Sequence, residues 1–182
     1  MADMIENYMA QPETLSTEEI YHGKTFNVRI DDVREDDLTY KREIVTHRGS
    51  SVIVPLFDDG TVALVKQWRQ PAGKYLLEIP AGSLEKGEDP RTGAIRELEE
   101  EIGCTAGSIE KLVEFYVSPG FLTEKMHVFL ATGLIETAQN LDEDERIDIV
   151  RLPLAEALDL CRNNTIEDAK TIIGLTFTAS RS

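Results

Sequence analysis

The sequence predicts an α+β domain in which strands and helices do not alternate as regular βαβ units. Strand-like stretches precede the first helical stretch, at about residues 89–103, further strands follow it, and two helical stretches close the chain. This order argues against a doubly wound parallel sheet. At 182 residues the chain is long enough for one well-packed domain and short for two. Its 41% hydrophobic and 29% charged residues are typical of a soluble globular chain.

The first 47 residues combine a polar arm with an antiparallel β segment. Residues 1–17 show no pattern, and we expect a loose arm there. The stretches Phe26–Asp31 and Tyr40–Val45 alternate between apolar and polar residues, as half-buried strands do. The acidic stretch Glu35–Leu38 between them predicts a hairpin loop. We therefore divide the chain into this segment, residues 1–47, and a main domain, residues 48–182.

The main domain begins with another predicted hairpin. The stretches Ser51–Phe57 and Thr61–Trp68 are rich in β-branched residues, and an Asp-Asp-Gly turn joins them. A short strand at Tyr75–Ile79 ends at a proline and leads into a glycine-containing loop, Ala81–Gly87. These elements predict a β layer directly before the first helix.

The first helix has clear start and stop signals. Asp89 and Pro90 suit its first turn, and Gly103 is a natural C-terminal stop. An acidic loop, Asp142–Glu145, precedes the last strand. The elements expected after the first helix are strands at Ile109–Val117, Lys125–Ala131 and Ile147–Leu152, then helices at Leu154–Arg162 and Ile166–Leu175.

The charge balance excludes several classes of partner. Acidic residues number 34 against 19 basic ones, a formal net charge of -15. Binding to nucleic acid or to anionic lipid needs clustered lysine and arginine, so we expect neither partner. One interpretation is that the excess acidic residues simply keep the protein soluble. The other is that some of them form a divalent-cation site. Only two cysteines occur, and no signal peptide or 20-residue apolar run is present, so we expect a cytoplasmic protein without disulfides.

The densest chemical signal is an acidic cluster inside the first helix. Glu97, Glu100 and Glu101 have i, i+3, i+4 spacing, so their side chains share one face, while apolar residues at 95, 98 and 102 form a face to be buried. Like charges at this spacing repel by roughly 0.2–0.5 kcal/mol per pair, which a bound cation would relieve. Carboxylate oxygens favour Mg²⁺ or Mn²⁺ over Zn²⁺. The alternative is a solvated acidic face.

The cluster lies inside a longer pattern, GSLEKGEDPRTGAIRELEEEIGC, at residues 82–104. This pattern resembles the Nudix box, GX5EX7REUXEEXGU, in which U is a bulky apolar residue. Every fixed position matches, and the one soft departure is Cys104 in the final apolar position, where cysteine packs as a small hydrophobe. The resemblance covers roughly residues 40–175.

The resemblance implies a fold, a metal site and a reaction. The Nudix superfamily has an α/β/α sandwich with a mixed sheet, and its box binds divalent metals for attack by water on a diphosphate. By resemblance, Glu97 and Glu101 would be the main metal ligands, with Glu100 and the carbonyl of Ala81 as further ligands. Arg96 would orient a box carboxylate. The expected metal is Mg²⁺, with Mn²⁺ possible.

Residues outside the box are similar to the ADP-ribose pyrophosphatase subgroup. Pro119 lies fifteen positions after Cys104 in a Ser-Pro-Gly setting, and Glu124 follows it. The stretch LEIPAG at Leu77–Gly82 also looks like the lead-in to the box in that subgroup. The alternative for the Ser-Pro-Gly stretch is a plain turn.

In that subgroup a glutamate on an acidic loop serves as the catalytic base. By resemblance, Glu143 is our first choice for this role and Glu145 the second; the alternative is a solvated acidic turn. Arg69 looks like the arginine that grips the diphosphate through paired hydrogen bonds, unless it forms a surface salt bridge. Arg42 is a second candidate phosphate contact, supplied either within the chain or by a partner subunit. Phe26 could stack on adenine unless it is a core residue.

The resemblance therefore implies hydrolysis of ADP-ribose to AMP and ribose 5-phosphate by a homodimer in which residues 18–47 pack on the partner. Pro119 and Glu124 would belong to the substrate site. One alternative is a GDP-mannose or other nucleoside diphosphate sugar hydrolase. Another is a sensor that binds ADP-ribose without cutting it, although such modules usually lose box carboxylates. Hydrolysis of mRNA caps or dinucleoside polyphosphates is less favoured.

Overall fold

A computed structural model describes residues 11–141 and 145–181, and the chain divides into two compact units. The first unit comprises Met1–His47 and Tyr116–Glu124, and the second comprises Arg48–Phe115 and Lys125–Ser182. Each unit is described by itself below.

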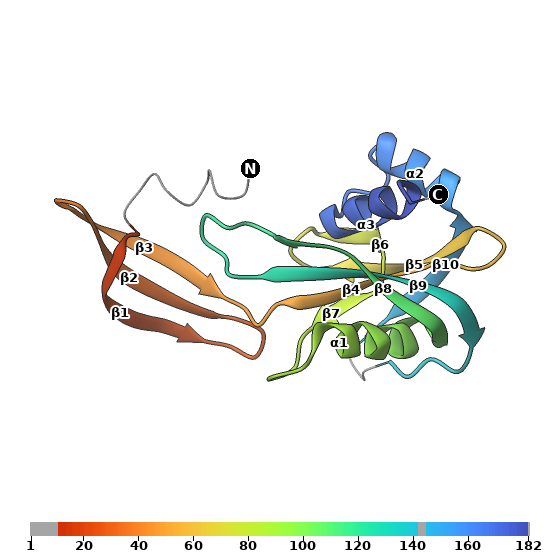
Figure 1. Ribbon diagram of the computed structural model, residues 1–182, viewed down its shortest axis with the longest axis horizontal. Coiled ribbons are helices and arrows are strands. Elements are labelled where there is room, and N and C mark those ends of the chain that lie inside the picture. The colour runs from red at the N-terminus through yellow and green to blue at the C-terminus, as the bar shows by residue number, and fades with distance from the viewer. Residues whose placement is uncertain (1–10, 142–144, 182) are drawn as a thin grey trace. The chain divides into compact units, whose positions relative to one another are not determined.

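The first unit is a three-stranded antiparallel sheet. Its strands β1 (Glu13–His22), β2 (Asn27–Glu35) and β3 (Leu38–Thr46) lie in the order β1-β2-β3 (Figure 1). The predicted hairpin between the second and third strands is thus confirmed. The expectation of a loose arm through residue 17 is wrong for the described residues 13–17, which begin β1. Side-chain hydrogen bonds link β1 to β2, from Ser16 to Asp32 (2.9 Å) and from Thr17 to Asp31 (2.8 Å). These polar contacts stabilise β1, which has no buried apolar face.

The segment Tyr116–Glu124, which belongs to the same unit, is hydrogen-bonded to β3. The Val45 N–H donates to the carbonyl of Phe121 (2.8 Å), and the Thr123 N–H donates to the carbonyl of Val45 (3.0 Å). The unit therefore joins residues far apart in the sequence through backbone hydrogen bonds.

The second unit contains two sheets. One has the order β10-β5-β6, and the other has the order β7-β4-β9-β8. Strands β4 and β9 are parallel, whereas β4 and β7, β5 and β6, and β5 and β10 are antiparallel, so the strand arrangement is mixed, as predicted. The strand bounds are β4 (Ser50–Pro55), β5 (Thr61–Arg69), β6 (Lys74–Glu78), β7 (Ala81–Ser83), β8 (Cys104–Tyr116), β9 (Lys125–Glu136) and β10 (Ile147–Pro153).

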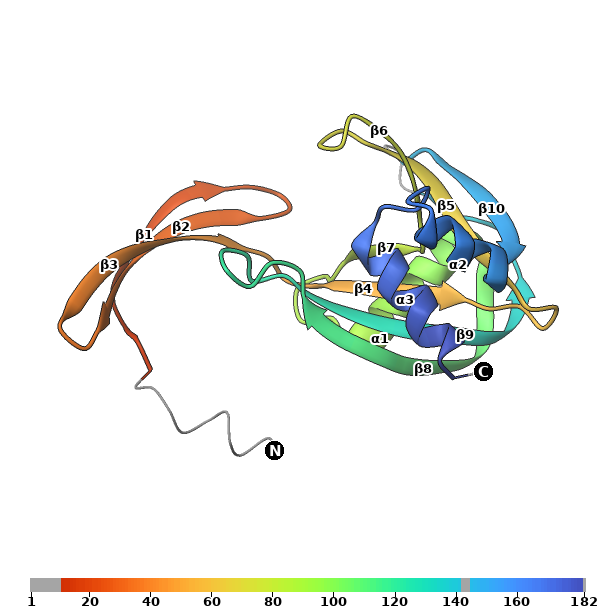
Figure 2. The same cartoon turned by 90° about the horizontal axis from the view of Figure 1, so that it is seen from above.

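Helices cover both sides of these strands. Helix α1 (Pro90–Glu97) lies on one side, and α2 (Leu154–Arg162) and α3 (Ala169–Ala179) lie on the other (Figure 1). Helix α3 lies over β4 and β9 (Figure 2). The predicted α/β/α sandwich is therefore confirmed. In the part of the chain that the structure describes, no helix is long and apolar enough to span a membrane.

Two hydrophobic cores follow from the alternation of side chains along the strands. In β4, Val52 and Val54 belong to the core beneath α2 and α3, whereas Ile53 faces α1. The core on the α1 side consists of the buried residues Ile53, Ala63, Val65, Ala94, Leu98, Ile102, Cys104, Phe129 and Ala131. Cys104 thus packs as a small hydrophobe, as expected from its place at the end of the box.

The first helix differs from the single element that was predicted. The α-helical part ends at Glu97, and a π-helical turn, η2 (Leu98–Ile102), carries the rest of the acidic cluster. Gly103 follows with a φ of 66°, the left-handed conformation typical of glycine at a helix end. The last helix begins three residues later than predicted because Asp168 caps it, accepting a hydrogen bond from the Thr171 N–H (3.0 Å).

Candidate active site

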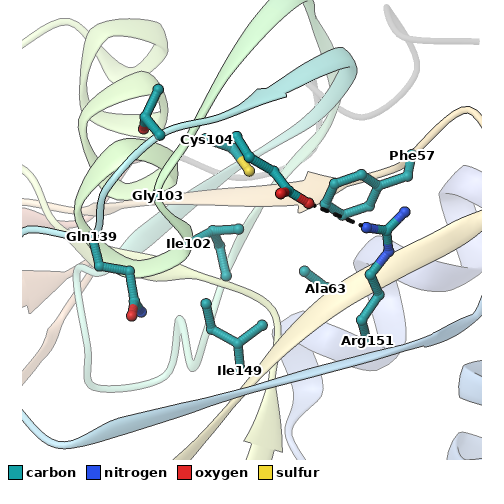
Figure 3. Close-up of a pocket in the computed structure, with 10 residues that line it drawn as sticks. Phe57, Ala63, Ile102, Gly103, Cys104, Gln139, Ile149 and Arg151 are labelled. Atoms are coloured by element: carbon teal, nitrogen blue, oxygen red, sulfur yellow. Dashed lines mark hydrogen bonds and ion pairs between the residues drawn. The ribbon is translucent and has the colours of Figure 1, made fainter.

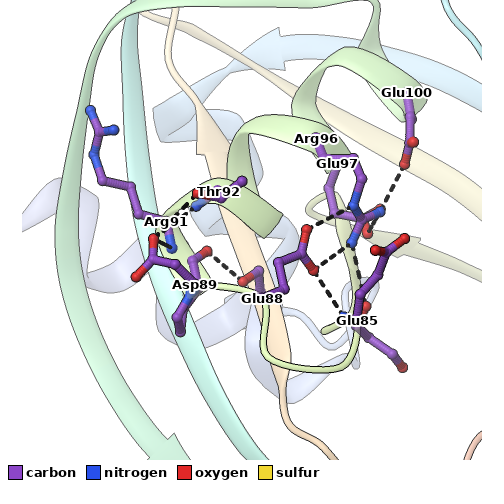
Figure 4. Close-up of polar contacts among 11 residues, drawn as sticks. Glu85, Glu88, Asp89, Arg91, Thr92, Arg96, Glu97 and Glu100 are labelled. Carbon is purple, nitrogen blue, oxygen red and sulfur yellow. Dashed lines mark hydrogen bonds and ion pairs between the residues drawn. The ribbon is translucent and has the colours of Figure 1, made fainter.

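The acidic cluster is held at the sheet by the apolar face of its own helix. Asp89 caps α1 by accepting hydrogen bonds from the N–H groups of Arg91 (3.0 Å) and Thr92 (3.1 Å) (Figure 4). Leu98 and Ile102 are buried in the core on the α1 side. The same packing buries two neighbouring acidic residues, one helical turn apart. Glu97 is 5% exposed and Glu101 is 3% exposed.

Arg96 organises the acids around it (Figure 4). Its Nε and Nη2 atoms donate to the two carboxylate oxygens of Glu88, at 3.1 and 3.2 Å. Its Nη1 donates to Glu97 (2.5 Å) and to Glu100 (2.9 Å). One guanidinium therefore orients three box carboxylates, an arrangement that suits the role predicted for Arg96.

The backbone before the helix contacts the second buried carboxylate, that of Glu101. The Ala81 N–H donates to Oε2 of Glu101 (3.2 Å). A Cβ atom on Gly82 would lie only 1.9 Å from Oε1 of Glu97, so the backbone can approach this carboxylate only as glycine. The backbone of Ala81 and Gly82 thus lies beside the side chains of both Glu97 and Glu101, while Glu100 is half-buried.

The surroundings of the two buried carboxyl groups, Glu97 and Glu101, disfavour their charged forms and so raise their pKa values. Burial raises the pKa of Glu97 to about 7, even though Arg96 acts in the opposite direction. Burial, together with the charges of Glu97 and Glu145, raises the pKa of Glu101 to about 8. A cation placed between these groups would relieve both effects.

The donor atoms at this position fit a hard divalent cation. Glu97 and Glu101 offer carboxylate oxygens, which Mg²⁺ and similar ions prefer. Among the described residues, no three acidic, histidine or cysteine side chains are already gathered into a metal-binding cluster. Arg96 is paired with the carboxylates of Glu97 and Glu100.

Arg69 lies at the end of β5 and forms a salt bridge, the alternative considered above, but its partner Glu78 is buried and was missed by the sequence analysis. Its Nε and Nη2 each donate to one oxygen of Glu78 at 2.7 Å. Glu78 is 1% exposed and also pairs with the buried Lys170, which in turn lies 3.0 Å from Asp168. Burial tends to raise the pKa of Glu78, but Arg69 and Lys170 outweigh it and hold the pKa below its ordinary value.

This network borders the carboxylate cluster. The positive charge of Arg69 partly offsets the rise in the pKa of Glu101, and the negative charge of Glu101 adds to the effect of Glu78 in raising the pKa of Arg69. The only sequence signal for Glu78 was a single charge inside the apolar run LEIP. Nothing local marked Lys170, which is 92 residues away along the chain.

Two predicted substrate residues of the first unit have local partners. The Arg42 guanidinium lies 4.0 Å from the centre of the Tyr40 ring. The Phe26 ring is 43% exposed and lies 5.8 Å, centre to centre, from the ring of Tyr21. Phe26 is therefore not a core residue within its own unit.

The other two predicted substrate residues flank a turn in the same unit. Around Pro119 the N–H groups of Phe121 (3.2 Å) and Leu122 (2.9 Å) donate to the carbonyl of Ser118, so the plain turn considered above is present. The carboxylate of Glu124 lies 3.8 Å from Nδ1 of His47. The substrate residues predicted apart from Arg69 thus belong to the first unit, whereas the box belongs to the second.

The acidic loop contains both candidates for the base. Glu143 lies outside the described residues. Glu145 is described, and its charge is close enough to raise the pKa values of Glu97 and Glu101. It also lines a pocket of about 420 Å³ with Tyr75. Trp68 is 45% exposed and meets Tyr75 edge to face, with the ring centres 5.3 Å apart.

Comparison with known proteins identifies relatives along most of the chain. A family model described as the NUDIX domain matches residues 47–173. The chain is 42% identical over 170 residues to a methanol dehydrogenase activator of Bacillus methanolicus, and 41% identical over 170 residues to an ADP-ribose pyrophosphatase of Bacillus subtilis (strain 168). Each match covers 92% of both chains. A crystal structure of an ADP compounds hydrolase shares the fold, with a TM-score of 0.79, 23% identity and 96% of both chains covered.

Proposed function

This chain belongs to the Nudix family, and we propose that it hydrolyses the diphosphate bond of ADP-ribose or a closely related nucleoside diphosphate sugar. The observation that carries the proposal is the pair of buried carboxylates, Glu97 and Glu101, held against the Ala81–Gly82 backbone inside an intact Nudix box. The relative named ADP-ribose pyrophosphatase supports this class of substrate.

A divalent cation, Mg²⁺ or Mn²⁺, completes the proposed site. Glu97 and Glu101 would hold it, assisted by Glu100 and the carbonyl of Ala81. When bound, such a cation supplies positive charge to the diphosphate and makes an attacking water more acidic. Arg96 keeps the box carboxylates oriented through the hydrogen bonds described above.

The remaining roles fall to groups around the carboxylates. Arg69, held by Glu78, would bind a phosphate oxygen through its remaining guanidinium face. A glutamate of the acidic loop would accept the proton of the attacking water. Support for Glu145 is its electrostatic effect on Glu97 and Glu101, whereas Glu143 rests on the family resemblance alone.

We also propose that the protein is a homodimer assembled through the first unit. Every residue of β1 is exposed, and among them Leu15, Ile20 and Tyr21 expose 45 to 52% of their surface. A second copy covering this face would bury these side chains, and it would supply Arg42 and Phe26 to the partner's substrate. Sedimentation should give twice the chain mass at micromolar concentration, and Ile20→Asp should give the monomer. A monomeric wild-type protein would contradict the dimer.

The reaction is tested in separate samples, each containing the protein, Mg²⁺ and one substrate. The substrates are ADP-ribose, GDP-mannose, diadenosine polyphosphates and nucleoside triphosphates. We expect AMP to form fastest in the ADP-ribose sample and to be lost in Glu101→Gln, which keeps the size of the side chain. A faster reaction with GDP-mannose would still support the proposed metal site, but it would replace ADP-ribose by GDP-mannose as the preferred substrate. Binding of ADP-ribose without turnover would indicate a sensor and contradict the enzyme.

A second candidate function comes from the 42% identical relative named methanol dehydrogenase activator. We expect that, if this chain acts in the same way, it raises the rate of a methanol dehydrogenase in a mixture of the two proteins. Glu101→Gln separates the possibilities, because activation that depends on hydrolysis would disappear with this variant. No stimulation by the wild-type protein would exclude this second function for the dehydrogenase used.

A further inference from the structure

The first turn of α3 holds the backbone of the segment that follows β6. The hydroxyl of Thr171 accepts a hydrogen bond from the Ile79 N–H at 2.9 Å and itself donates to the Asp168 carboxylate at 2.5 Å. Thr171 and Ile79 are both fully buried. Pro80, the next residue, has no N–H, so this bond satisfies the one backbone donor between the end of β6 and the start of β7.

The side chain of Ile79 is held by the same helix. A Cβ atom on Gly174 would lie 2.6 Å from Cδ1 of Ile79 and 3.1 Å from Cγ2 of Val54, so even a methyl group here would force Ile79 to shift. Gly174 lies three positions after Thr171, on the same face of α3. One helix face therefore contacts both the backbone and the side chain of Ile79.

The same segment ends against the two carboxylates proposed as metal ligands. Ala81 lies two residues after Ile79, and its N–H donates to Oε2 of Glu101 at 3.2 Å. Gly82 follows, and its backbone lies beside the carboxylate of Glu97. A short run of backbone therefore connects α3, on one side of the sheets, to the carboxylates of the box, on the other side (Figure 1).

The helix side of this contact is held by other groups. Nε2 of Gln139 donates to the carbonyl of Glu101 at 2.6 Å. Gln139 lines a pocket of about 320 Å³ with Ile102 and Cys104, which belong to the core on the α1 side, and none of the described residues that line it comes from α3 (Figure 3). Glu101 and Ala81 are thus anchored separately, so the loss of one anchor changes the position of one residue relative to the other.

We propose that Thr171 is a positioning residue, whose hydroxyl holds the backbone of residues 81–82 against the two buried carboxylates. This inference rests on the proposed function, because the part that is held is the proposed metal site. The hydroxyl acts through the Ile79 backbone. Removing a group that orients metal ligands from outside typically lowers metal affinity or activity by about 10- to 100-fold.

The test replaces Thr171 by valine, which has the same shape and keeps the N–H that is bonded to the helix cap, but lacks the hydroxyl. We expect Mn²⁺ affinity to fall about 10-fold. At saturating Mn²⁺ we expect kcat for ADP-ribose to fall about 10-fold while KM changes less than about 2-fold. Thr171→Ser keeps the hydroxyl, so all three values should stay within about 2-fold of wild type. Thr171→Ala, which also lacks the hydroxyl, replaces the valine variant if that protein does not fold.

Thr178→Val is the matched control. Thr178 is also buried in α3, at 2% exposed, and its hydroxyl donates to the carbonyl of Gly174 within the same helix at 2.9 Å. This variant undergoes the same chemical change and should keep its Mn²⁺ affinity and kcat. Unchanged Mn²⁺ affinity and kcat in the variants that lack the Thr171 hydroxyl, or equal losses in Thr178→Val, would overturn the proposal.

Failure of the proposed function gives a different pattern. If wild type neither binds Mn²⁺ nor hydrolyses any of the substrates, hydrogen exchange of the Ala81 N–H in the metal-free protein, followed by NMR, still tests the positioning contact. Faster exchange in Thr171→Val than in wild type and Thr178→Val would support the contact, and equal exchange in the three proteins would reject it.

Discussion

Arg69 and Glu78 form a two-point ion pair between neighbouring strands, in which each carboxylate oxygen accepts one guanidinium N–H at 2.7 Å. Glu78 is almost completely buried, and Lys170 approaches the same carboxylate from α3. The direction of the Arg69 side chain is therefore set by a network reaching from β5 to the far helix layer.

Removing the second cation should destabilise the protein. Lys170→Met leaves buried Glu78 with one cation and Asp168 without its ion-pair partner. We expect the free energy of unfolding, measured with urea, to fall by about 3 kcal/mol. Lys74→Met is the matched control, because it breaks an exposed pair with Glu167 and should cost less than about 1 kcal/mol. Similar losses in the two variants would contradict the argument.

Replacing Arg69 by lysine should weaken substrate binding. Lysine keeps the charge but cannot bind Glu78 through two parallel bonds and still present a guanidinium face to phosphate. We expect KM for ADP-ribose to rise about 10-fold with a smaller change in kcat. Arg162→Lys, at an exposed pair with Asp159, serves as the control and should leave KM unchanged. An unaltered KM in Arg69→Lys would remove Arg69 from the substrate site.

The stability of the metal-free protein should fall as pH rises. The pKa values of Glu97 and Glu101 are raised to about 7 and about 8, above their ordinary range, so their protonated forms favour the folded state at low pH. This contribution is lost as pH rises through those values. We expect Tm in EDTA to decrease between pH 6 and 9, and Mg²⁺ to restore Tm most at the upper end. In Glu101→Gln the rise in Tm caused by Mg²⁺ should be smaller. An equal rise in Tm at pH 6 and at pH 9 in the wild-type protein would contradict this prediction.

A methyl group on Gly82 should displace the carboxylate of Glu97, which we propose as a metal ligand. Its Cβ atom would lie 1.9 Å from the Glu97 carboxylate, so that side chain must move in Gly82→Ala. We expect kcat/KM to fall about 100-fold, since ligand displacement misaligns the reacting groups. Gly107→Ala provides the control, because its Cβ would meet its nearest neighbour at 3.4 Å. Comparable losses in the two glycine variants would indicate general damage to the fold.

Several elements were predictable because their causes are local. The alternation in β2 and β3, the turn between β4 and β5, and the capping residues of α1 all act within a few positions of the chain. The start of β1 was missed because that strand is supported by polar bonds to β2 instead of by an apolar pattern. The π-helical turn was missed because its i, i+3, i+4 spacing looks like that of an ordinary helix.

By itself, the sequence determined the family box, the sandwich of strands and helices, and the set of carboxylates that the helix carries, because spacing along one helix decides which side chains share a face. Only the tertiary structure decided what surrounds those carboxylates. The pairing of Glu78 with Lys170 and the bond from Gln139 to Glu101 join residues 92 and 38 positions apart. Such contacts depend on how separate elements pack together, and no local pattern of residues records that packing.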